Sequence, residues 1–112
     1  MDSLSDINRR QSEILIEMAS IDSMRIGTVS PNTKVRSTKD GGSVSSTYYV
    51  LSYKDANQKT ISESVRSDRV EEYQRLVDNT KVFRNLVKEY EALADNKAKI
   101  LLSGKEDSKK NE

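Results

Sequence analysis

The 112-residue sequence contains neither cysteine nor histidine. Without cysteine the chain has no disulfide framework, no thiolate metal ligand and no cysteine nucleophile. Without histidine it also lacks the Ser-His and Cys-His nucleophile pairs and the usual general base near neutral pH. These absences exclude the common zinc sites. They predict a protein that is not an enzyme, with no metal site, no cofactor and no small-molecule substrate.

Long apolar runs are missing as well. No stretch approaches the roughly 18 consecutive apolar residues that a membrane span needs. The first six residues also lack the basic and apolar regions of a signal peptide. We therefore expect a soluble, cytoplasmic protein without a membrane partner.

Charge is distributed unevenly, although the formal net charge is only +1. The balance is −3 over residues 1–24, +4 over residues 25–66 and zero over the remainder. Such an asymmetry is more informative than the total. It makes the middle of the chain the candidate region for contact with nucleic acid.

The hydrophobic pattern predicts an α+β fold in the order N-terminal helix, long loop, β-hairpin and long C-terminal helix. Apolar residues at three-and-four spacing over residues 4–21 predict the first helix, with Ser3 or Ser5 as its cap and an end near Met24 to Gly27. Residues 28–47 are rich in Ser, Thr, Gly and Lys. They predict a long mobile loop, with room for one short strand around residues 34–38.

The β-hairpin is predicted from two segments rich in strand-forming residues, 47–54 and 60–65, with turn residues between them. A three-residue loop with one left-handed residue would pair Tyr53 with Ile61 and Tyr49 with Val65. This register gathers the apolar side chains on one face: Tyr49, Leu51, Tyr53, Ile61 and Val65. The opposite face then carries mainly hydroxyl and basic groups.

From Val70 onward apolar residues recur at helical spacing, with no glycine or proline before Gly104. The pattern predicts one long helix or two helices broken near residues 78–80, capped by Ser67 or Asp68. Heptad spacing relates Leu76, Phe83 and Tyr90, and also Leu86, Leu93 and Ile100. This spacing gives the helix coiled-coil character. We expect residues 1–104 to form a single small domain and residues 105–112 a disordered charged tail.

The segment Ser46 to Lys54, followed by Lys59-Thr60 and by Phe83-Arg84-Asn85-Leu86, resembles a small bacterial family. That family is a functionally uncharacterised domain, often encoded beside transposase genes, with a paired-tyrosine hairpin followed by a long helix. The resemblance implies a link to a mobile element. Typical members also carry a cysteine cluster and a His-Gly-Pro before the tyrosines. This sequence has neither, so any metal site of the family would be absent here.

The first functional hypothesis is a non-enzymatic accessory protein that binds nucleic acid through the basic loop and the polar face of the hairpin. A two-stranded ribbon fits the major groove, and cations and hydroxyl groups suit phosphates and base edges. The same residue types are common on solvated surfaces, and the tyrosines can instead fill the core. The candidate binding residues are Lys34, Arg36, Lys39, Tyr48, Lys54, Lys59, Ser62 and Arg66.

The alternative hypothesis is a helical module for protein–protein interaction or oligomerisation. Its partner would be a second copy of the chain or a helix of another protein. The heptad residues could also serve only to seat the first helix within the same chain. The candidate interface residues are Phe83, Leu86, Tyr90, Leu93 and Ile100.

Overall fold

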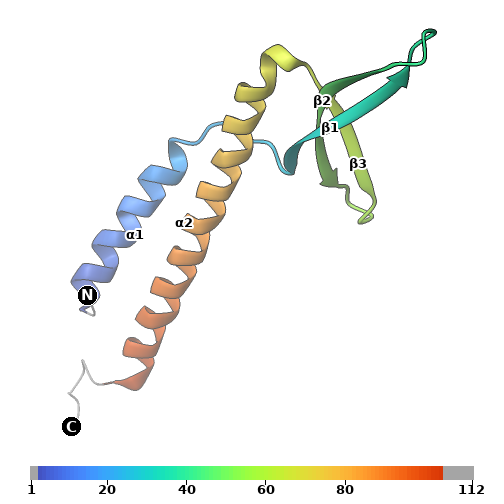
Figure 1. Cartoon of the computed structure of the whole chain (residues 1–112). Helices are drawn as coiled ribbons and strands as arrows, with labels where there is room; N and C mark the ends of the chain where they lie inside the picture. The colour runs from blue at the N-terminus through green and yellow to red at the C-terminus, as the bar shows by residue number, and fades with distance from the viewer. Residues whose placement is uncertain (1–2, 105–112) are drawn as a thin grey trace. The chain divides into compact units, whose positions relative to one another are not determined.

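The computed structural model describes residues 3–104, which divide into two compact units. The helical unit combines residues 3–22 with residues 81–104, and the sheet unit is residues 23–80. The elements follow in the order α1 (Leu4–Ala19), β1 (Thr28–Ser37), β2 (Ser43–Lys54), β3 (Thr60–Val65), the 3-10 turn η1 (Ser67–Arg69) and α2 (Val70–Ser103) (Figure 1). This order confirms the α+β class. The single domain over residues 1–104 stays a prediction, and the tail at 105–112 lies outside the described residues.

α1 is an amphipathic helix capped by Ser3. The Ser3 hydroxyl accepts a hydrogen bond from the backbone N–H of Asp6 at 3.1 Å, which confirms one of the two predicted caps. Ile7 and Ile14 are buried, but Leu15, which the spacing assigns to the same stripe, is 52% exposed. The buried stripe of α1 is therefore narrower than the sequence predicts.

The predicted end of the first helix is wrong. α1 ends at Ala19, well before Met24 to Gly27. Ser20 is the C-terminal cap: its hydroxyl donates to the carbonyl of Glu17 at 2.6 Å, and its backbone N–H bonds to carbonyl groups of the last turn. These bonds satisfy carbonyl groups of the last turn that would otherwise lack a partner within the helix.

The core of the helical unit lies where α1 and the second part of α2 run side by side in opposite directions (Figure 1). Ile7 and Ile14 pack there with Leu86 and Leu93. Each fully buried side chain of this size contributes about 1.5 to 3 kcal/mol. Four partly buried residues complete the cluster: Met18, Ile21, Tyr90 and Ile100. The heptad residues Leu86, Leu93 and Ile100 thus seat α1 within the same chain.

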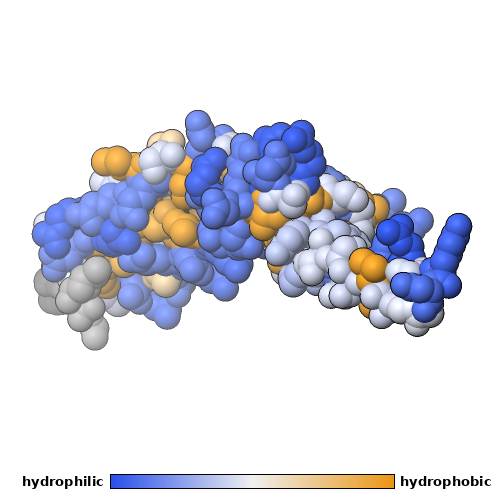
Figure 2. Space-filling view, turned by 45° about the horizontal axis from the view of Figure 1, so that its top comes forward, coloured by the Kyte–Doolittle hydropathy of each residue, from blue (hydrophilic) through white to orange (hydrophobic). Residues whose placement is uncertain are grey.

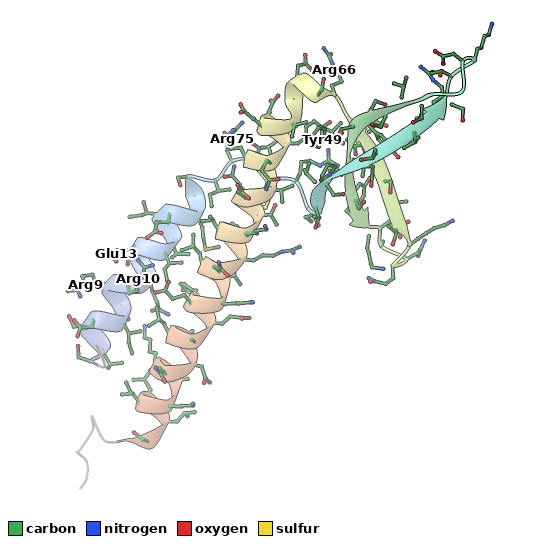
Figure 3. The ribbon with its side chains drawn as sticks, viewed as in Figure 1. Arg9, Arg10, Glu13, Tyr49, Arg66 and Arg75 are labelled. Carbon is green, nitrogen blue, oxygen red and sulfur yellow. The ribbon has the colours of Figure 1, made fainter. Side chains whose placement is uncertain are left out.

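Polar contacts flank this core on both sides. On one side the guanidinium group of Arg10 forms two hydrogen bonds to the carboxylate of Glu89, at 2.7 and 2.9 Å, and a third to Glu13 at 3.2 Å (Figure 3). The hydrogen bond from Arg10 holds the pKa of Glu89 below its ordinary value. On the other side the ammonium group of Lys97 donates to the side-chain oxygen of Asn8 at 2.7 Å. These contacts set the register of the two helices.

α2 is one continuous helix, so the break that the sequence allowed near residues 78–80 does not occur. The polar residues there bind the segment that precedes β1. The Asn79 amide donates to the carbonyl of Ser23 at 3.1 Å, and the Thr80 hydroxyl donates to the carbonyl of Arg25 at 2.6 Å. Thr80 is buried, and this bond satisfies its hydroxyl. Asn79 and Thr80, which the sequence suggested as a helix break, instead attach the segment before β1 to α2.

The beginning of α2 differs from the predicted capping box. A 3-10 turn, Ser67–Arg69, precedes the helix, and the cap position is Arg66, which makes no side-chain capping bond. The Asp68 carboxylate instead accepts a hydrogen bond from the Arg66 guanidinium at 2.9 Å. Neither Ser67 nor Asp68 is therefore the cap.

The sheet has three antiparallel strands in the order β1-β2-β3. The long loop predicted over residues 28–47 is wrong, because β1 and the first half of β2 form a hairpin there. Lys39 and Asp40 form its turn, which is closed by a hydrogen bond from the Gly41 N–H to the Thr38 carbonyl at 3.2 Å, and Gly41 has a φ of 85°. Backbone pairing therefore orders a segment that the composition describes as mobile.

The second hairpin has the predicted register. Tyr49 pairs with Val65 and Tyr53 pairs with Ile61. The left-handed residue of its three-residue loop is Gln58, with a φ of 64°. The loop is fastened by the Asp55 carboxylate, which accepts hydrogen bonds from the backbone N–H groups of Asn57 and Lys59 at 2.8 and 3.0 Å.

Leu51, Val65 and Val77 form the buried core of the sheet unit. Five partly buried residues pack against them: Val29, Tyr49, Tyr53, Val70 and Tyr73. Gly27 allows the chain to enter β1 beside this core. Its φ is 136°, and a Cβ atom there would lie 2.5 Å from the carbonyl oxygen of Ser52. Only glycine fits this close approach.

Candidate nucleic-acid interface

One face of the sheet, here called the polar face, is formed by the even-numbered residues of the strands. Both strand pairings join even-numbered residues to even-numbered residues, and side chains alternate between the two faces of a sheet. The polar face consists of Thr28, Ser30, Asn32, Lys34, Arg36, Val44, Ser46, Tyr48, Val50, Ser52, Lys54, Thr60, Ser62 and Ser64. None of these described strand residues is acidic and none is buried. The polar face therefore carries mainly hydroxyl groups and cations, and it is exposed except at Ser30, Val50 and Ser52, which are half-buried.

Five of the eight predicted binding residues share this face. They are Lys34, Arg36, Tyr48, Lys54 and Ser62. From the sequence they were predicted to lie partly on a loop and partly on a hairpin, but the pairing of β1 with β2 brings them onto one sheet.

The cations nevertheless form two separate groups. Lys34 lies opposite Ser46, and Lys54 is eight residues further along the same strand. At about 3.3 Å per residue this separation is roughly 26 Å. Lys34 and Arg36 form the arm group together with Lys39. Lys54 forms the turn group together with Lys59, which follows the three-residue loop at residues 56–58.

The arm group belongs to a two-stranded extension of the sheet, here called the arm (residues 32–48). β3 pairs only with residues 49–54 of β2, so β1 and β2 continue past it as a ribbon (Figure 1). All strand residues of the arm are exposed on both faces. The Lys34 ammonium group lies over the ring of Tyr48, 5.8 Å from its centroid. The arm therefore presents an aromatic ring beside its cations.

Asp40 is the only acidic residue of the arm, and the turn at its tip engages this carboxylate. It accepts hydrogen bonds from the Thr38 hydroxyl and from the backbone N–H of Gly42. The Thr38 hydroxyl is the main reason that the pKa of Asp40 lies below its ordinary value. Lys39, beside it, is exposed at the tip.

Within the described part of the chain, the arm cations form no ion pair, as is also true of Arg75 and Arg84 of α2, whereas several other arginines do. Arg10, Arg25 and Arg69 each form an ion pair with a carboxylate. Within residues 3–104, Lys34, Arg36 and Lys39 form none, and so their charges remain available to a ligand.

The remaining predicted residues lie elsewhere. The Lys54 ammonium group donates to the Thr60 hydroxyl at 3.5 Å, and Arg66 is paired with Asp68 at 2.9 Å. The five residues assigned to a helical interface fall into two kinds. Leu86 and Leu93 are buried against α1, whereas Phe83, Tyr90 and Ile100 are partly buried.

Sequence reasoning missed the ion pair between Arg25 and Glu63. The Arg25 guanidinium donates to both carboxylate oxygens of Glu63, at 2.8 and 3.1 Å, and Tyr73 donates its hydroxyl to the same carboxylate at 3.3 Å. Arg25 also lies between two rings, 5.7 Å from the centroid of Tyr53 and 5.8 Å from that of Tyr73. The sequence does contain a signal for this ion pair. Side chains alternate between the two faces of a strand, which places Glu63 on the same face as Ile61 and Val65. A carboxylate between apolar neighbours requires a partner.

This ion pair makes the stability of the sheet unit depend on acidic pH. The hydrogen bonds from Arg25 are the main reason that the pKa of Glu63 is lowered from its ordinary 4.5. Because the folded-state pKa is the lower one, the stabilisation is complete above pH 4.5 and is lost as the pH falls through the folded-state value. Glu63→Gln should be less stable than the wild type at pH 7, with a difference that shrinks toward acid. Urea midpoints between pH 7 and pH 3 measure this.

Glu71→Gln is the matched control for that series, since Glu71 is an exposed carboxylate on the first turn of α2. Its stability should follow that of the wild type across the same pH range. A Glu63→Gln curve parallel to that of the wild type would contradict the assigned role of the ion pair.

Within residues 3–104 no group of three acidic side chains is placed to hold a metal ion. None of the described helices combines the length and the apolar character that crossing a membrane requires. No protein-family model matches the chain, and neither the curated proteins nor the solved structures contain a match. The resemblance to the bacterial family stays a prediction.

Proposed function

We propose that the protein binds duplex DNA, with the arm lying in the major groove. The observation that carries this proposal is the arm itself: a two-stranded ribbon, exposed on both faces, whose three cations have no carboxylate partner among the described residues. The major groove is about 12 Å wide and admits a two-stranded β-ribbon. Phosphate contacts by Lys34, Arg36 and Lys39 position the ribbon on the duplex.

The composition of the arm supports contact with base edges as well. Between its cations the ribbon exposes Asn32 and a series of serine and threonine residues: Thr33, Ser37, Ser43, Ser45, Ser46 and Thr47. Hydroxyl and amide groups both donate and accept hydrogen bonds. They can therefore contact the donor and acceptor groups of the major groove. The association with a mobile element is proposed from the family resemblance alone.

The salt dependence of binding tests this function. Three phosphate contacts at about −0.9 each predict a slope of about −2.7 for log K against log salt concentration. Affinity for a duplex should then fall by roughly 1.5 decades between about 50 and 200 mM salt. Fluorescence anisotropy with a labelled duplex measures the slope. A slope of about −4.5 would mean that Lys54 and Lys59 contact phosphates too.

Two control probes separate groove binding from other modes. Duplex RNA of the same sequence has a deep, narrow major groove that side chains cannot read, so it should bind more weakly than the DNA duplex. Single-stranded DNA should also bind more weakly, unless bases stack on Tyr48. Equal affinity for all three probes would exclude the groove model. Absence of binding at about 50 mM salt would exclude the function.

A further inference from the structure

The helical unit has a second apolar surface that α1 and α2 leave uncovered. Val87, Ala94 and Leu101 each follow one position after a residue that contacts α1, and so they lie about 100° further round the helix. Leu15 follows Ile14 on α1 in the same way. Leu15 is 52% exposed and Leu101 is 54% exposed. Figure 2 shows apolar residues reaching the surface of the helical unit among hydrophilic ones.

These residues lie on the same side of the helix pair. Lys97 is three residues after Ala94 and four before Leu101, and it donates to Asn8 across the pair at 2.7 Å. Asn8 in turn lies four residues after Leu4. This contact brings two rows together into one surface, here called the apolar side. It comprises Leu4, Leu15 and Met18 of α1 with Phe83, Val87, Tyr90, Ala94 and Leu101 of α2. Leu15 and Leu101 are its exposed members and the others are half-buried, Met18 and Tyr90 because they also pack on the core between the two helices.

The opposite side of the helix pair has a different character. Arg10 there bonds to Glu89, Glu13 and Glu17, so one guanidinium group bridges three carboxylates that are in contact with solvent. A helix hairpin with one charged side and one apolar side is half of a bundle. We propose that the apolar side is a homodimer interface, in which two copies of the helical unit pack into a four-helix bundle.

The size of the surface favours a second copy. The row on α2 from Phe83 to Leu101 is about 27 Å long at 1.5 Å per residue, and two helices about 9 Å apart present a width of about 18 Å. The product is about 500 Å² per copy, or about 1,000 Å² in total, which reaches the lower limit of specific interfaces. In a dimer with a two-fold axis, the apolar side of one copy faces the apolar side of the other, so apolar residues contact apolar residues.

This interface differs from the one assigned from the sequence. Leu93 is buried against α1 and Ile100 packs on the same cluster, so charging them would disrupt the helical unit itself. The informative positions are Leu15 and Leu101, which are half exposed. The proposal does not depend on DNA binding by the arm.

Sedimentation equilibrium of the full chain tests it. The wild type should show a concentration-dependent mass that approaches the dimer between about 1 and 100 µM. Leu15→Glu and Leu101→Glu should each remain monomeric over that range while keeping the helical circular dichroism signal. The matched control is Ile16→Glu, because Ile16 is 72% exposed and lies about 100° from Leu15 on the same helix. It should dimerise like the wild type. A monomeric wild type would overturn the proposal, as would loss of the dimer in Ile16→Glu alone.

A second measurement avoids charged substitutions altogether. The chain has no cysteine, so a single cysteine at position 15 or 16 can be alkylated selectively. Alkylation of Leu15→Cys should slow at least severalfold as the protein concentration rises through the dissociation constant, whereas that of Ile16→Cys should stay constant. If the alkylation rate of Leu15→Cys is the same below and above the dissociation constant, another surface forms the dimer.

Discussion

Reversing the three arm cations, as Lys34→Glu, Arg36→Glu and Lys39→Glu in one variant, should reduce DNA affinity at least about a hundredfold at low salt. Each of these residues is proposed to contact a phosphate, and the loss of each contact at about 50 mM salt is worth about one decade. The fold should persist, because exposed charges contribute at most about 1 kcal/mol each to stability. Fluorescence anisotropy and a urea midpoint measure the two quantities separately.

The matched control reverses three cations of the sheet unit that lie outside the arm: Lys54, Lys59 and Arg66. The change in net charge is the same, but Lys54 and Lys59 lie roughly 26 Å or more from Lys34 along the strand direction. Arg66 is nearer to the arm, but its guanidinium group is paired with Asp68 at 2.9 Å. Their long-range effect is screened, since the Debye length is about 10 Å at 0.1 M salt. Their reversal should lower affinity by less than about tenfold. Equal losses in the two variants would mean that net charge drives binding without a specific role for the arm.

Leu51→Ala should destabilise the sheet unit by about 2 to 5 kcal/mol. Leu51 is fully buried, packs with Val65 and Val77, and has Val29 and Glu63 as its cross-strand partners. Removing its side chain leaves a cavity that the paired strands cannot close. A loss of this size is a large fraction of the stability of a small domain. Urea unfolding followed by circular dichroism is the measurement.

Val50→Ala is the control for the core prediction. Val50 is the neighbouring residue on the same strand, but it lies on the polar face and is only partly buried. Its truncation should cost less than about 1.5 kcal/mol. Because a one-residue slip in register would exchange the two faces, a larger loss at Val50 than at Leu51 would contradict the observed pairing.

The second hairpin was predictable because three local signals agree. Strand-forming residues, a turn with one left-handed position and the separation of Tyr49, Tyr53 and Val65 from the serines all indicate one register. The continuous helix α2 was likewise one of two predicted options. In both cases the interactions that decide the structure connect residues that are close in sequence or share one face.

β1 was not predictable in the same way. Its second half is exposed on both faces, so the alternation of apolar and polar residues that identifies a strand is absent. Pro31 and the hydroxyl residues around it also indicate a loop by composition. The strand exists because its backbone pairs with β2, and this information is not local. For the same reason the sequence could not show that Lys34 and Arg36 share a face with Tyr48.

The sheet unit is an insertion in the helical unit, since residues 23–80 separate the two parts of the latter. This order dictates when each unit can fold during translation. Arg10 and Glu89 are 79 residues apart in sequence, so at about 5 to 20 residues per second the ribosome needs several seconds to supply the partner of α1. By then every residue of the sheet unit has been made. The sheet unit can therefore close first, while the apolar stripe of α1 stays uncovered on the nascent chain until the second part of α2 emerges.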